Sequence, residues 1–366
     1  VVADAPRPEP SRAQPELVKP AEGLPGRPDV RRLRLIRRLY FDLAWRSPQL
    51  EEIARWYPKP HEEMVKTLLA DPETWKVWYE QQLFYFLLLD RFRPRGGRLS
   101  TLPTRLAERE LDVMQALQEI VRSQEFGARN PGNDTFVTVV LEQCLGMVVQ
   151  EKRNLRVLES GKKMYDGYRA KIFRQQGDSQ ADFVRIVFDQ EAVARHFLAR
   201  MWEQLHGRAM ERDRLERDAT RLKQDGRAFR AILTEWLTGP DYVEGSDRAR
   251  TKASIPYVRA LFLDLLGRTP SYEELRNVRN AFLSLADPTP IRLVMGRILL
   301  QSNQARLPVS VMDPERFVKE QFVRLLARPA TAGELDTFVG ALKRDATVTP
   351  VVVLWTLVSS AEYQTY

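Results

Sequence analysis

One phrase recurs along this chain at a constant step of 60 residues. Three segments align without gaps: MWEQLHGRAMERDRLERDATRL (201–222), LFLDLLGRTPSYEELRNVRNAF (261–282) and QFVRLLARPATAGELDTFVGAL (321–342). A looser fourth copy, LYFDLAWRSPQLEEIARW (39–56), aligns with residues 261–278 at an offset of 222. A long internal period is typical of stacked supersecondary units. The repeat therefore predicts a chain built from four related modules.

The copy FLDLLGRTPSYEEL (262–275) shows why the phrase should form a pair of helices. Gly267 stands where the first helix should stop, because glycine adopts a positive φ at little cost. Ser271 can cap the next helix, and Glu273 and Glu274 follow in the first turn, where the helix dipole favours negative charge. The apolar residues that continue at helical spacing predict an inward stripe: Leu275, Val278 and Phe282.

Each copy ends in a second recurring pattern about one helix later. The pattern is an apolar helical run, a small or turn-forming residue, and then an acidic or polar residue. The four endings are LLADPETW (68–75), WLTGPDYV (236–243), LLQSNQAR (299–306) and LVSSAEYQ (357–364). We therefore expect three helices in every unit. No segment shows the alternation and turn rhythm of an all-β fold, so the predicted fold class is all-α.

An arginine stands in register in every copy: Arg46, Arg208, Arg268 and Arg328. Together with the glutamates of the next helix, it could belong to a catalytic site or to a structural ion pair. A helix-terminal arginine beside unpaired carbonyls and a first-turn glutamate would stabilise any helical hairpin. The polar members also change between copies, since Glu273 becomes Gly333. The pattern therefore favours architecture over chemistry.

The repeat and the composition divide the chain into six segments. Residues 1–30 hold seven of the 23 prolines. Because proline fixes φ and removes an amide donor, we expect an extended tether there. The predicted segments are the tether (1–30), the first unit (31–81), an insertion (82–195), the second unit (196–255), the third unit (256–312) and the fourth unit (313–366).

The insertion is predicted to combine helices with irregular stretches. We expect an amphipathic helix over 106–126, a turn at Asn-Pro-Gly-Asn (130–133), and an apolar helix, or a less favoured strand, over 136–149. The basic stretch DRFRPRGGRLS (90–100) and the polar, glycine-punctuated stretch 159–179 are predicted to be loops.

The composition is that of a folded globular protein. The chain is 43% apolar and 29% charged, and its 57 basic and 49 acidic residues give a net charge of +8. This balance permits contact with nucleic acid, phospholipid headgroups or acidic polysaccharide without choosing among them. No apolar run approaches the roughly 18 residues that a membrane-spanning helix needs. The most apolar windows, LFYFLLL (83–89) and VVVLWTLV (351–358), are predicted to lie in the buried core.

Residues that commonly carry chemistry are sparse. Cys144 is the single cysteine, and its apolar neighbours predict a buried, unreactive thiol. His61 is expected in a loop, whereas His196 and His206 share one helix about 15 Å apart, too far to hold one metal ion. Phosphate-binding, dinucleotide-binding and nucleophile-elbow motifs are absent from the sequence. We therefore assign no catalytic, cofactor-binding or metal-binding residue.

Two basic tracts could contact a polyanion. The first contains Arg31, Arg32, Arg34, Arg37 and Arg38, and the second contains Lys162, Lys163, Arg169, Lys171 and Arg174, interleaved with Tyr165, Tyr168 and Phe173. Such charges could follow phosphates while the rings stack on bases. Neither tract belongs to a known nucleic-acid-binding module. The favoured interpretation is a solvated helix face for the first tract and a solvated loop for the second.

Several of these phrases resemble one group of families. RRLYFDLAWRSPQLEEI (37–53) and EEMVKTLLADPETWKVWYEQQL (62–83) resemble the opening of planctomycete-type cytochrome-c-associated domains of unknown function, and NPGNDTFVTVVLEQCLG (130–146) is similar to their turn-plus-helix segment. VARHFLARMWEQLHGRAM (193–210) and ILTEWLTGPDYV (232–243) look like the companion domain. The chain departs from this pattern by two extra units at its end. The resemblance implies an exported, mainly helical protein, sometimes beside or fused to c-type cytochromes, and it implies no reaction.

These observations predict a non-enzymatic, extracytoplasmic helical scaffold or interaction subunit of a larger envelope-associated assembly. We expect protein partners, a membrane or anionic surface near the N-terminal region, and no cofactor, nucleic acid or small-molecule substrate. One alternative is an enzyme or electron-transfer accessory that acts on polysaccharide or on a partner c-type cytochrome, with a concave pocket near the insertion that holds carboxylates of perturbed pKa. A second alternative is a polyanion-binding protein. The expected location is the periplasm or another extracytoplasmic compartment, with the tether leading to a membrane.

Overall fold

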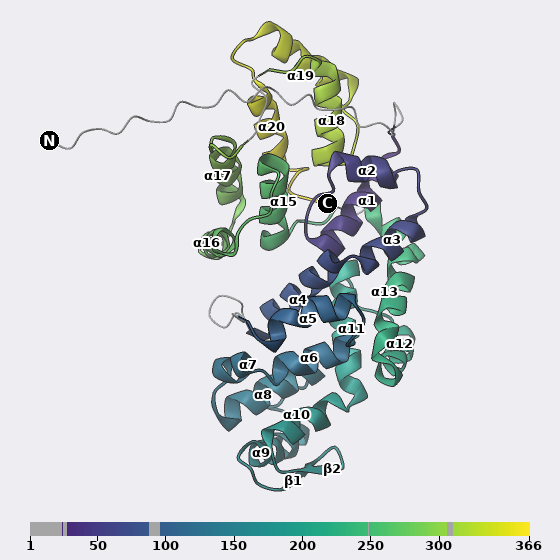
Figure 1. The fold of residues 1–366 in the computed structure, drawn as a ribbon, viewed down its shortest axis with the longest axis vertical. Helices are drawn as coiled ribbons and strands as arrows, with labels where there is room; N and C mark the ends of the chain where they lie inside the picture. Colours follow the sequence, from purple (N-terminus) through teal and green to yellow (C-terminus); the bar gives the residue numbers. More distant parts are fainter. Residues whose placement is uncertain (1–23, 25–27, 88–95, 248, 306–309) are drawn as a thin grey trace, which may run out of the picture.

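The structure is a computed structural model that describes residues 24, 28–87, 96–247, 249–305 and 310–366 (Figure 1). Within these residues the chain forms twenty α-helices. The strands of this part form one antiparallel hairpin, β1 (Ala170–Ile172) and β2 (Gln175–Gly177), in which Lys171 lies opposite Gln176. The all-α prediction is therefore confirmed. Nearly all of the predicted tether and most of the stretch 90–100 lie outside the described residues.

Four groups of three helices coincide with the four copies of the repeat. The first two groups are α1 (Val30–Ala44), α2 (Leu50–Trp56) and α3 (His61–Ala70), then α11 (Glu191–His206), α12 (Arg212–Gln224) and α13 (Phe229–Thr238). The last two are α15 (Ser254–Leu266), α16 (Tyr272–Leu283) and α17 (Thr289–Leu300), then α18 (Pro314–Leu326), α19 (Ala332–Arg344) and α20 (Pro350–Val358). The short helices η2 (Gly226–Ala228), α14 (Pro240–Val243) and η3 (Glu244–Asp247) belong to the second group. Each unit thus has the predicted three helices.

The insertion is helical and continuous with its neighbours. Its elements are α4 (Pro72–Leu87), η1 (Arg98–Thr101), α5 (Leu102–Ala107), α6 (Val113–Val121), α7 (Gln124–Arg129), α8 (Gly132–Leu145), α9 (Lys152–Tyr165), the β1–β2 hairpin and α10 (Gln180–Phe188). Helix α4 crosses the expected boundary at residue 82, and α11 crosses the one at residue 196. The helix predicted over 136–149 corresponds to α8.

The single helix predicted over 106–126 is wrong, because the chain forms α5, α6 and α7 there. Two side chains start new helices within this stretch. Asp112 accepts a hydrogen bond from the backbone amide of Gln115 at 2.9 Å, and Ser123 accepts one from that of Phe126 at 3.1 Å. Both bonds satisfy amides that a helix leaves unpaired at its first turn. The amphipathic pattern continues through these breaks, which is why it suggested one helix.

The loop predicted over 159–179 is also wrong, since this stretch contains the end of α9 and the β1–β2 hairpin. The two residues between the strands, Phe173 and Arg174, both have positive φ angles, +47° and +66°. Two-residue hairpin turns favour this geometry because it matches the strand twist, and they usually use asparagine or glycine. Phenylalanine and arginine gave no turn signal in the sequence.

The turn after the first helix of every unit has the same backbone conformation. The φ angle is +53° at Trp45, +67° at Gly207, +66° at Gly267 and +53° at Ala327. The helix stop predicted at Gly267 is therefore confirmed. The conformation costs a residue other than glycine about 1–2 kcal/mol. Packing compensates at Trp45, whose ring lies 6.1 Å from that of Phe84.

An arginine–glutamate pair closes the helical hairpin in three units. Arg268 donates to both carboxylate oxygens of Glu274 at 2.7 and 2.9 Å. Glu274 also completes a capping box with Ser271, which confirms the predicted N-cap. The same two-bond pair recurs elsewhere at 2.7–2.8 Å: Arg46 with Glu52, and Arg328 with Glu334.

The repeated arginine also reaches the turn that ends its unit. Its acceptors occupy one equivalent position of the four endings: Glu73, Asp241, Gln304 and Glu362. Arg328, for example, lies 2.7 Å from Glu362. In the second unit Arg214 replaces the hairpin glutamate, and it joins Arg208 on Asp241. In the first, third and fourth units this arginine therefore connects the helical hairpin with the turn that ends the unit.

The buried apolar side chains form two cores. One core unites the first unit, the insertion and the second unit, and the other unites the third and fourth units. We call these parts the N-terminal body (residues 28–247) and the C-terminal body (residues 249–366). Figure 1 shows an elongated molecule with the C-terminal body at its upper end. Val323 of α18 and Ala327, the residue that follows α18, pack in the N-terminal core and join the bodies.

Adjacent arginines of α1 link units from both bodies. Arg38 donates to the carbonyl of Leu205 at 2.8 Å, and Arg37 donates to the carbonyl of Leu325. Leu205 and Leu325 occupy the same position of the repeat, near the ends of α11 and α18. The carbonyls at a helix C-terminus lack intrahelical donors and carry partial negative charge. Helix α1 is therefore the element on which the second and fourth units both converge.

Candidate functional site

The structure brings two of the three histidines together. His61 is the first residue of α3 rather than part of a loop, and His196 and His206 both lie on α11 as predicted. The rings of His61 and His206 flank Tyr242, with ring centroids 6.4 and 5.9 Å away. Among the described residues, no group of three or more His, Cys, Asp or Glu could hold a metal ion.

All three histidines are held in their neutral form. Burial lowers the pKa of His61, His196 and His206, and for His206 it lowers the pKa to about 4. His206 stacks on Trp202 at 3.6 Å between ring centroids. Its Nε2 atom is buried without a hydrogen-bond partner in the described part of the chain. Burial of the ring outweighs the carbonyl of Trp202 and the charge of Asp241, which both favour the protonated form.

Cys144 lies in the N-terminal core, where the sequence predicted it. Burial raises the pKa of its thiol to about 12. Because the thiolate is the nucleophilic form, this thiol is inert at neutral pH. Cys144 therefore contributes to packing.

The first basic tract is not the solvated helix face that was predicted. Arg37 and Arg38 are each only 3% exposed. Arg32 donates to three carbonyls around the end of α2: those of Trp56, Tyr57 and Lys59. The prediction was wrong because one helix's periodicity does not reveal that other units enclose it. Buried arginine is tolerated here because backbone carbonyls accept its donors.

The second basic tract is divided between α9 and the hairpin. Lys162 forms ion pairs with Asp134 at 2.7 Å and Glu159 at 3.0 Å. The ring of Tyr165 packs 5.3 Å from that of Phe136, whereas Tyr168 is 67% exposed. Part of the charge is therefore neutralised, and the rings do not form a continuous stacking surface.

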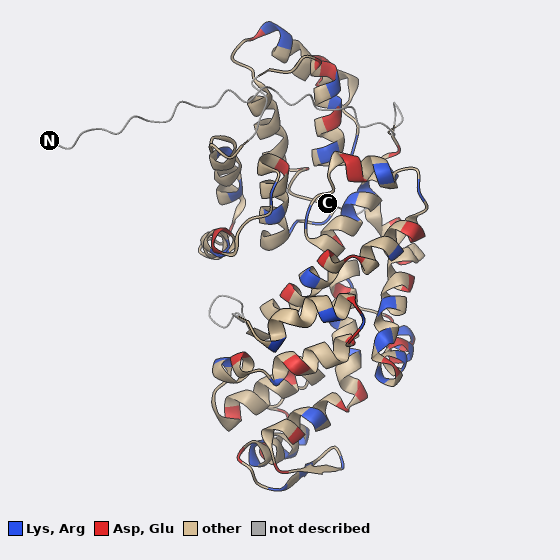
Figure 2. Ribbon diagram, viewed as in Figure 1, with Lys and Arg blue, Asp and Glu red and all other residues tan. Residues whose placement is uncertain are grey.

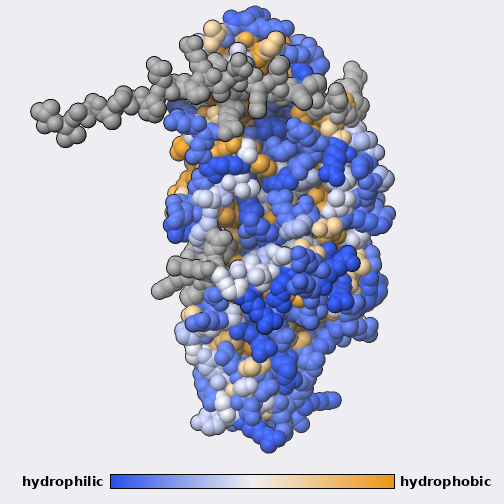
Figure 3. All heavy atoms as spheres, in the orientation of Figure 1, coloured by the Kyte–Doolittle hydropathy of each residue, from blue (hydrophilic) through white to orange (hydrophobic). Residues whose placement is uncertain are grey.

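The most distinctive exposed surface lies on the C-terminal body. Eleven large apolar side chains of the described residues are exposed, and seven of them come from α16, the loop after it, α17 and α20. The seven are Leu283, Leu285, Leu293, Val294, Ile298, Val352 and Trp355. We call them the α17/α20 surface. Figure 3 shows apolar atoms at the left edge of the molecule, where Figure 1 places α17.

Helices α17 and α20 are apolar on two opposite faces. On α17, Met295 and Leu299 are buried, whereas Val294 and Ile298 are 56% and 60% exposed. On α20, Trp355 is 41% exposed although its neighbour Leu354 is buried. Helix α20 carries no charged residue, as its tan colour in Figure 2 shows. The prediction that the window 351–358 lies wholly in the core is therefore wrong for its outward face.

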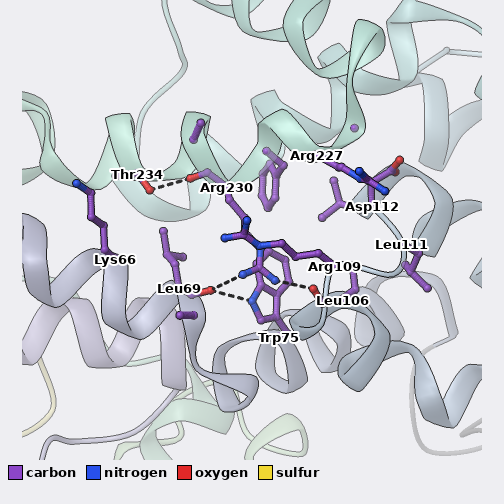
Figure 4. A pocket seen from close by; sticks show the side chains of 15 residues that line it. Lys66, Leu69, Trp75, Leu106, Arg109, Leu111, Asp112, Arg227, Arg230 and Thr234 are labelled. Carbon is purple, nitrogen blue, oxygen red and sulfur yellow. Dashed lines mark hydrogen bonds between the residues drawn. The ribbon is translucent and has the colours of Figure 1, made fainter.

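A cavity of about 580 Å³ opens between α3, α5, α6 and α13 (Figure 4). Its lining includes the aromatic side chains of Trp75 and Phe229. Four cationic side chains line it: Lys66, Arg109, Arg227 and Arg230. Asp112, the N-cap of α6, is the one carboxylate in the lining. The sequence did not indicate this site, because its residues come from three separate segments.

A second cavity, of about 680 Å³, lies beside the first and is lined by several carboxylates and arginines of the insertion. Among its carboxylates, Glu119 accepts hydrogen bonds from two arginines, Arg98 and Arg105. Burial acts to raise the pKa of Glu119, but hydrogen bonds from Arg105 and Arg98 outweigh it, and the net shift is downward. This carboxylate is thus held ionised, which is the opposite of what a general acid needs.

Comparison with models of protein families, with curated proteins and with solved structures finds no match to the chain. In the described part of the chain, every helix is too short or too polar to cross a bilayer.

Proposed function

We propose that the chain is a non-enzymatic scaffold or interaction subunit of a larger protein assembly, and that a protein partner packs on the α17/α20 surface. The concentration of seven exposed large apolar side chains on neighbouring elements carries this proposal. Apolar surface gathered in one place commonly marks an interaction site in soluble proteins. Covering it would contribute about 25 cal/mol for each Å² removed from water.

The architecture supports this role. Repeated helical units build extended surfaces from local contacts, and such surfaces suit partner binding. The repeated arginine holds three helices together in the first, third and fourth units, and α1 joins the first unit to the second and fourth. A partner would therefore meet a surface that is already formed, which lowers the entropy lost on binding.

The location outside the cytoplasm is part of the same proposal. It is supported by the proline-rich composition of residues 1–30 and by the resemblance to the planctomycete-type cytochrome-c-associated domains. In this proposal the N-terminal region leads to a membrane, and the C-terminal body carries the partner.

The alternatives have less support among the described residues. A polyanion-binding role loses three of the five arginines of the first basic tract, since Arg32, Arg37 and Arg38 donate to backbone carbonyls. An enzymatic role would be favoured by a pair of carboxylates with opposed pKa values in one pocket. The larger cavity instead holds Glu119 ionised between arginines, and the smaller is lined by one carboxylate.

Site-specific photo-crosslinking in the native host tests the proposal. A photoreactive amino acid is placed at Ile298 in the α17/α20 surface, and in a matched variant at Leu155, an exposed leucine of α9 in the N-terminal body. We expect a discrete crosslinked protein species from position 298 and none from position 155. Crosslinking at both positions alike, or at neither, would overturn the proposal.

The complementary measurement introduces a positive charge into the same apolar surface. Ile298→Lys places a charge in the centre of the apolar face and should remove the chain from its assembly, as judged by size-exclusion chromatography of native extracts. Leu155→Lys makes the same change elsewhere and should leave the elution position unaltered. Because both side chains are exposed, both variants should keep the wild-type melting temperature within a few degrees.

A further inference from the structure

We propose that the cavity between α3, α5, α6 and α13 binds a small organic anion with an apolar body and a terminal carboxylate. The site is distant in sequence and fold from the α17/α20 surface, and it does not depend on the scaffold role. Its volume of about 580 Å³ is within the range typical of small-molecule sites.

The charge of the lining favours an anion. Four cationic side chains and one carboxylate line the cavity. The guanidinium groups of Arg109 and Arg227 make no hydrogen bond or ion pair with any described residue. Lys66 pairs with Glu62, but both side chains are more than 60% exposed, so this pair is weak and Lys66 can turn toward a ligand.

Arg230 fixes the cationic wall in place. Its guanidinium carbon lies 4.3 Å from the ring centroid of Trp75. It donates to carbonyls at the ends of α3 and α5: those of Leu69, Leu106 and Ala107, at 3.2, 2.5 and 2.9 Å. These three bonds use three of the five N–H donors of the guanidinium. Two donors therefore remain for a ligand.

Arg109 and Arg230 bring two positive charges together in the lining of the cavity. In Figure 4 the side chain of Arg109 reaches across the cavity toward Arg230, above Trp75. Burial, and then the positive charge of Arg109, lower the pKa of Arg230 to about 10. A carboxylate at this point would relieve the repulsion, and its two oxygens match the fork of a guanidinium group.

The backbone conformation of Arg109 also supports a role for this arginine in binding an anion. Its φ angle is +62°, in the left-handed region that glycine tolerates and arginine does not favour. It follows the end of α5, where the amide of Glu110 bonds to the carbonyl of Arg105 at 2.9 Å. Helix ends of this kind usually place glycine at this position. Here an arginine occupies it, although its guanidinium has no structural partner in the described residues.

The remaining lining sets the chemical class of the ligand. Most of it is aliphatic or aromatic: Leu69, Ala70, Trp75, Leu106, Leu111, Val113, Phe229 and Ala231. An inorganic ion would leave this surface uncovered, whereas an acyl or aryl chain would cover it. The four cationic side chains bind the carboxylate, and the aliphatic and aromatic side chains pack against the apolar body of the ligand.

Isothermal titration calorimetry of the whole chain at low salt tests the assignment. The probes are 4-phenylbutyrate, its neutral amide, and inorganic phosphate. Arg109→Gly removes the cation and places at +62° the residue that prefers this conformation, so the fold should keep or gain stability. Arg156→Gln, which removes an exposed arginine of α9 outside the cavity, is the control for net charge.

We expect 4-phenylbutyrate to bind more tightly than the amide and more tightly than phosphate. Arg109→Gly should weaken its binding about tenfold or more, since one charge-assisted contact is lost. Arg156→Gln should bind like the wild type. Absence of 4-phenylbutyrate binding, or equal affinity in Arg109→Gly and wild type, would overturn the assignment. If phosphate binds more tightly than 4-phenylbutyrate, the proposal that the ligand has an apolar body is wrong.

Discussion

Tyr363 of the fourth unit donates its hydroxyl hydrogen to Asp264 of the third unit at 2.7 Å. The equivalent tyrosine of the second unit, Tyr242, makes the same contact with Asp42 of the first at 2.8 Å. The repeat therefore pairs its units, first with second and third with fourth, through one buried hydrogen bond. Asp264 also accepts from Ser47 at 3.0 Å, which carries the network from one body to the other.

Loss of the tyrosine hydroxyl should destabilise the chain. Tyr363→Phe leaves a fully buried carboxylate with one donor fewer, and we expect a loss of about 1–3 kcal/mol. Urea unfolding measures this against Tyr168→Phe, which removes a hydroxyl from a ring that is 67% exposed. The exposed variant should change by less than about 0.5 kcal/mol. Equal stability of both variants would show that the buried bond contributes nothing.

Replacing glycine by alanine should have opposite effects on stability in the left-handed turn and inside a helix. A Cβ at Gly267 would meet nothing within 4 Å, so Gly267→Ala adds only the strain of a positive φ, about 1–2 kcal/mol. A Cβ at Gly333 would be equally free, but Gly333 lies in the first turn of α19. Gly333→Ala should therefore stabilise the chain by up to about 1 kcal/mol. Thermal melts of the two variants should shift in opposite directions, and shifts of the same sign would contradict this account.

The repeated arginine should not be replaceable by lysine. Arg328 binds Glu334 through two nitrogens and Glu362 through a third, and lysine offers a single charged group. We expect Arg328→Lys to lose about 1 kcal/mol, a modest figure because the carboxylates are about a third exposed. Arg153→Lys alters a surface pair with Glu151 and should be neutral. Chemical denaturation compares the free energies of unfolding of the two variants. If Arg328→Lys is as stable as the wild type, the two-nitrogen contact with Glu334 does not contribute to stability.

Stability should fall as the pH falls from 7 to 5. The pKa values of the three histidines are lowered in the folded chain, so the unfolded chain binds protons first, below about pH 6.5. Proton uptake then favours unfolding by up to about 1.4 kcal/mol per pH unit for each histidine, until its folded pKa is reached. His206→Gln should flatten this slope, because the pKa of His206 is lowered to about 4. If the free energy of unfolding of His206→Gln depends on pH as steeply as that of the wild type, other groups cause the loss of stability.

Local signals predicted the helical units well. The stop at Gly267 and the cap at Ser271 depend on residues within one turn of each other, and the structure has both where they were expected. The same reasoning failed at Phe173 and Arg174, where the hairpin turn uses residues that give no turn signal. It also failed at Arg37, whose burial depends on the distant carbonyl of Leu325.

The all-α class, the repeat and the helix ends at Gly267 and Ser271 follow from the sequence alone, because periodicity, caps and helix stops act over a few neighbouring residues. Which apolar and charged faces meet protein, and which meet water, depends on how the units pack. Trp355 and Leu354 are adjacent and both apolar, yet only the leucine is buried. Arg109 and Arg230 are 121 residues apart and form one cationic wall. Such relations depend on how units pack, and a linear pattern does not contain that information.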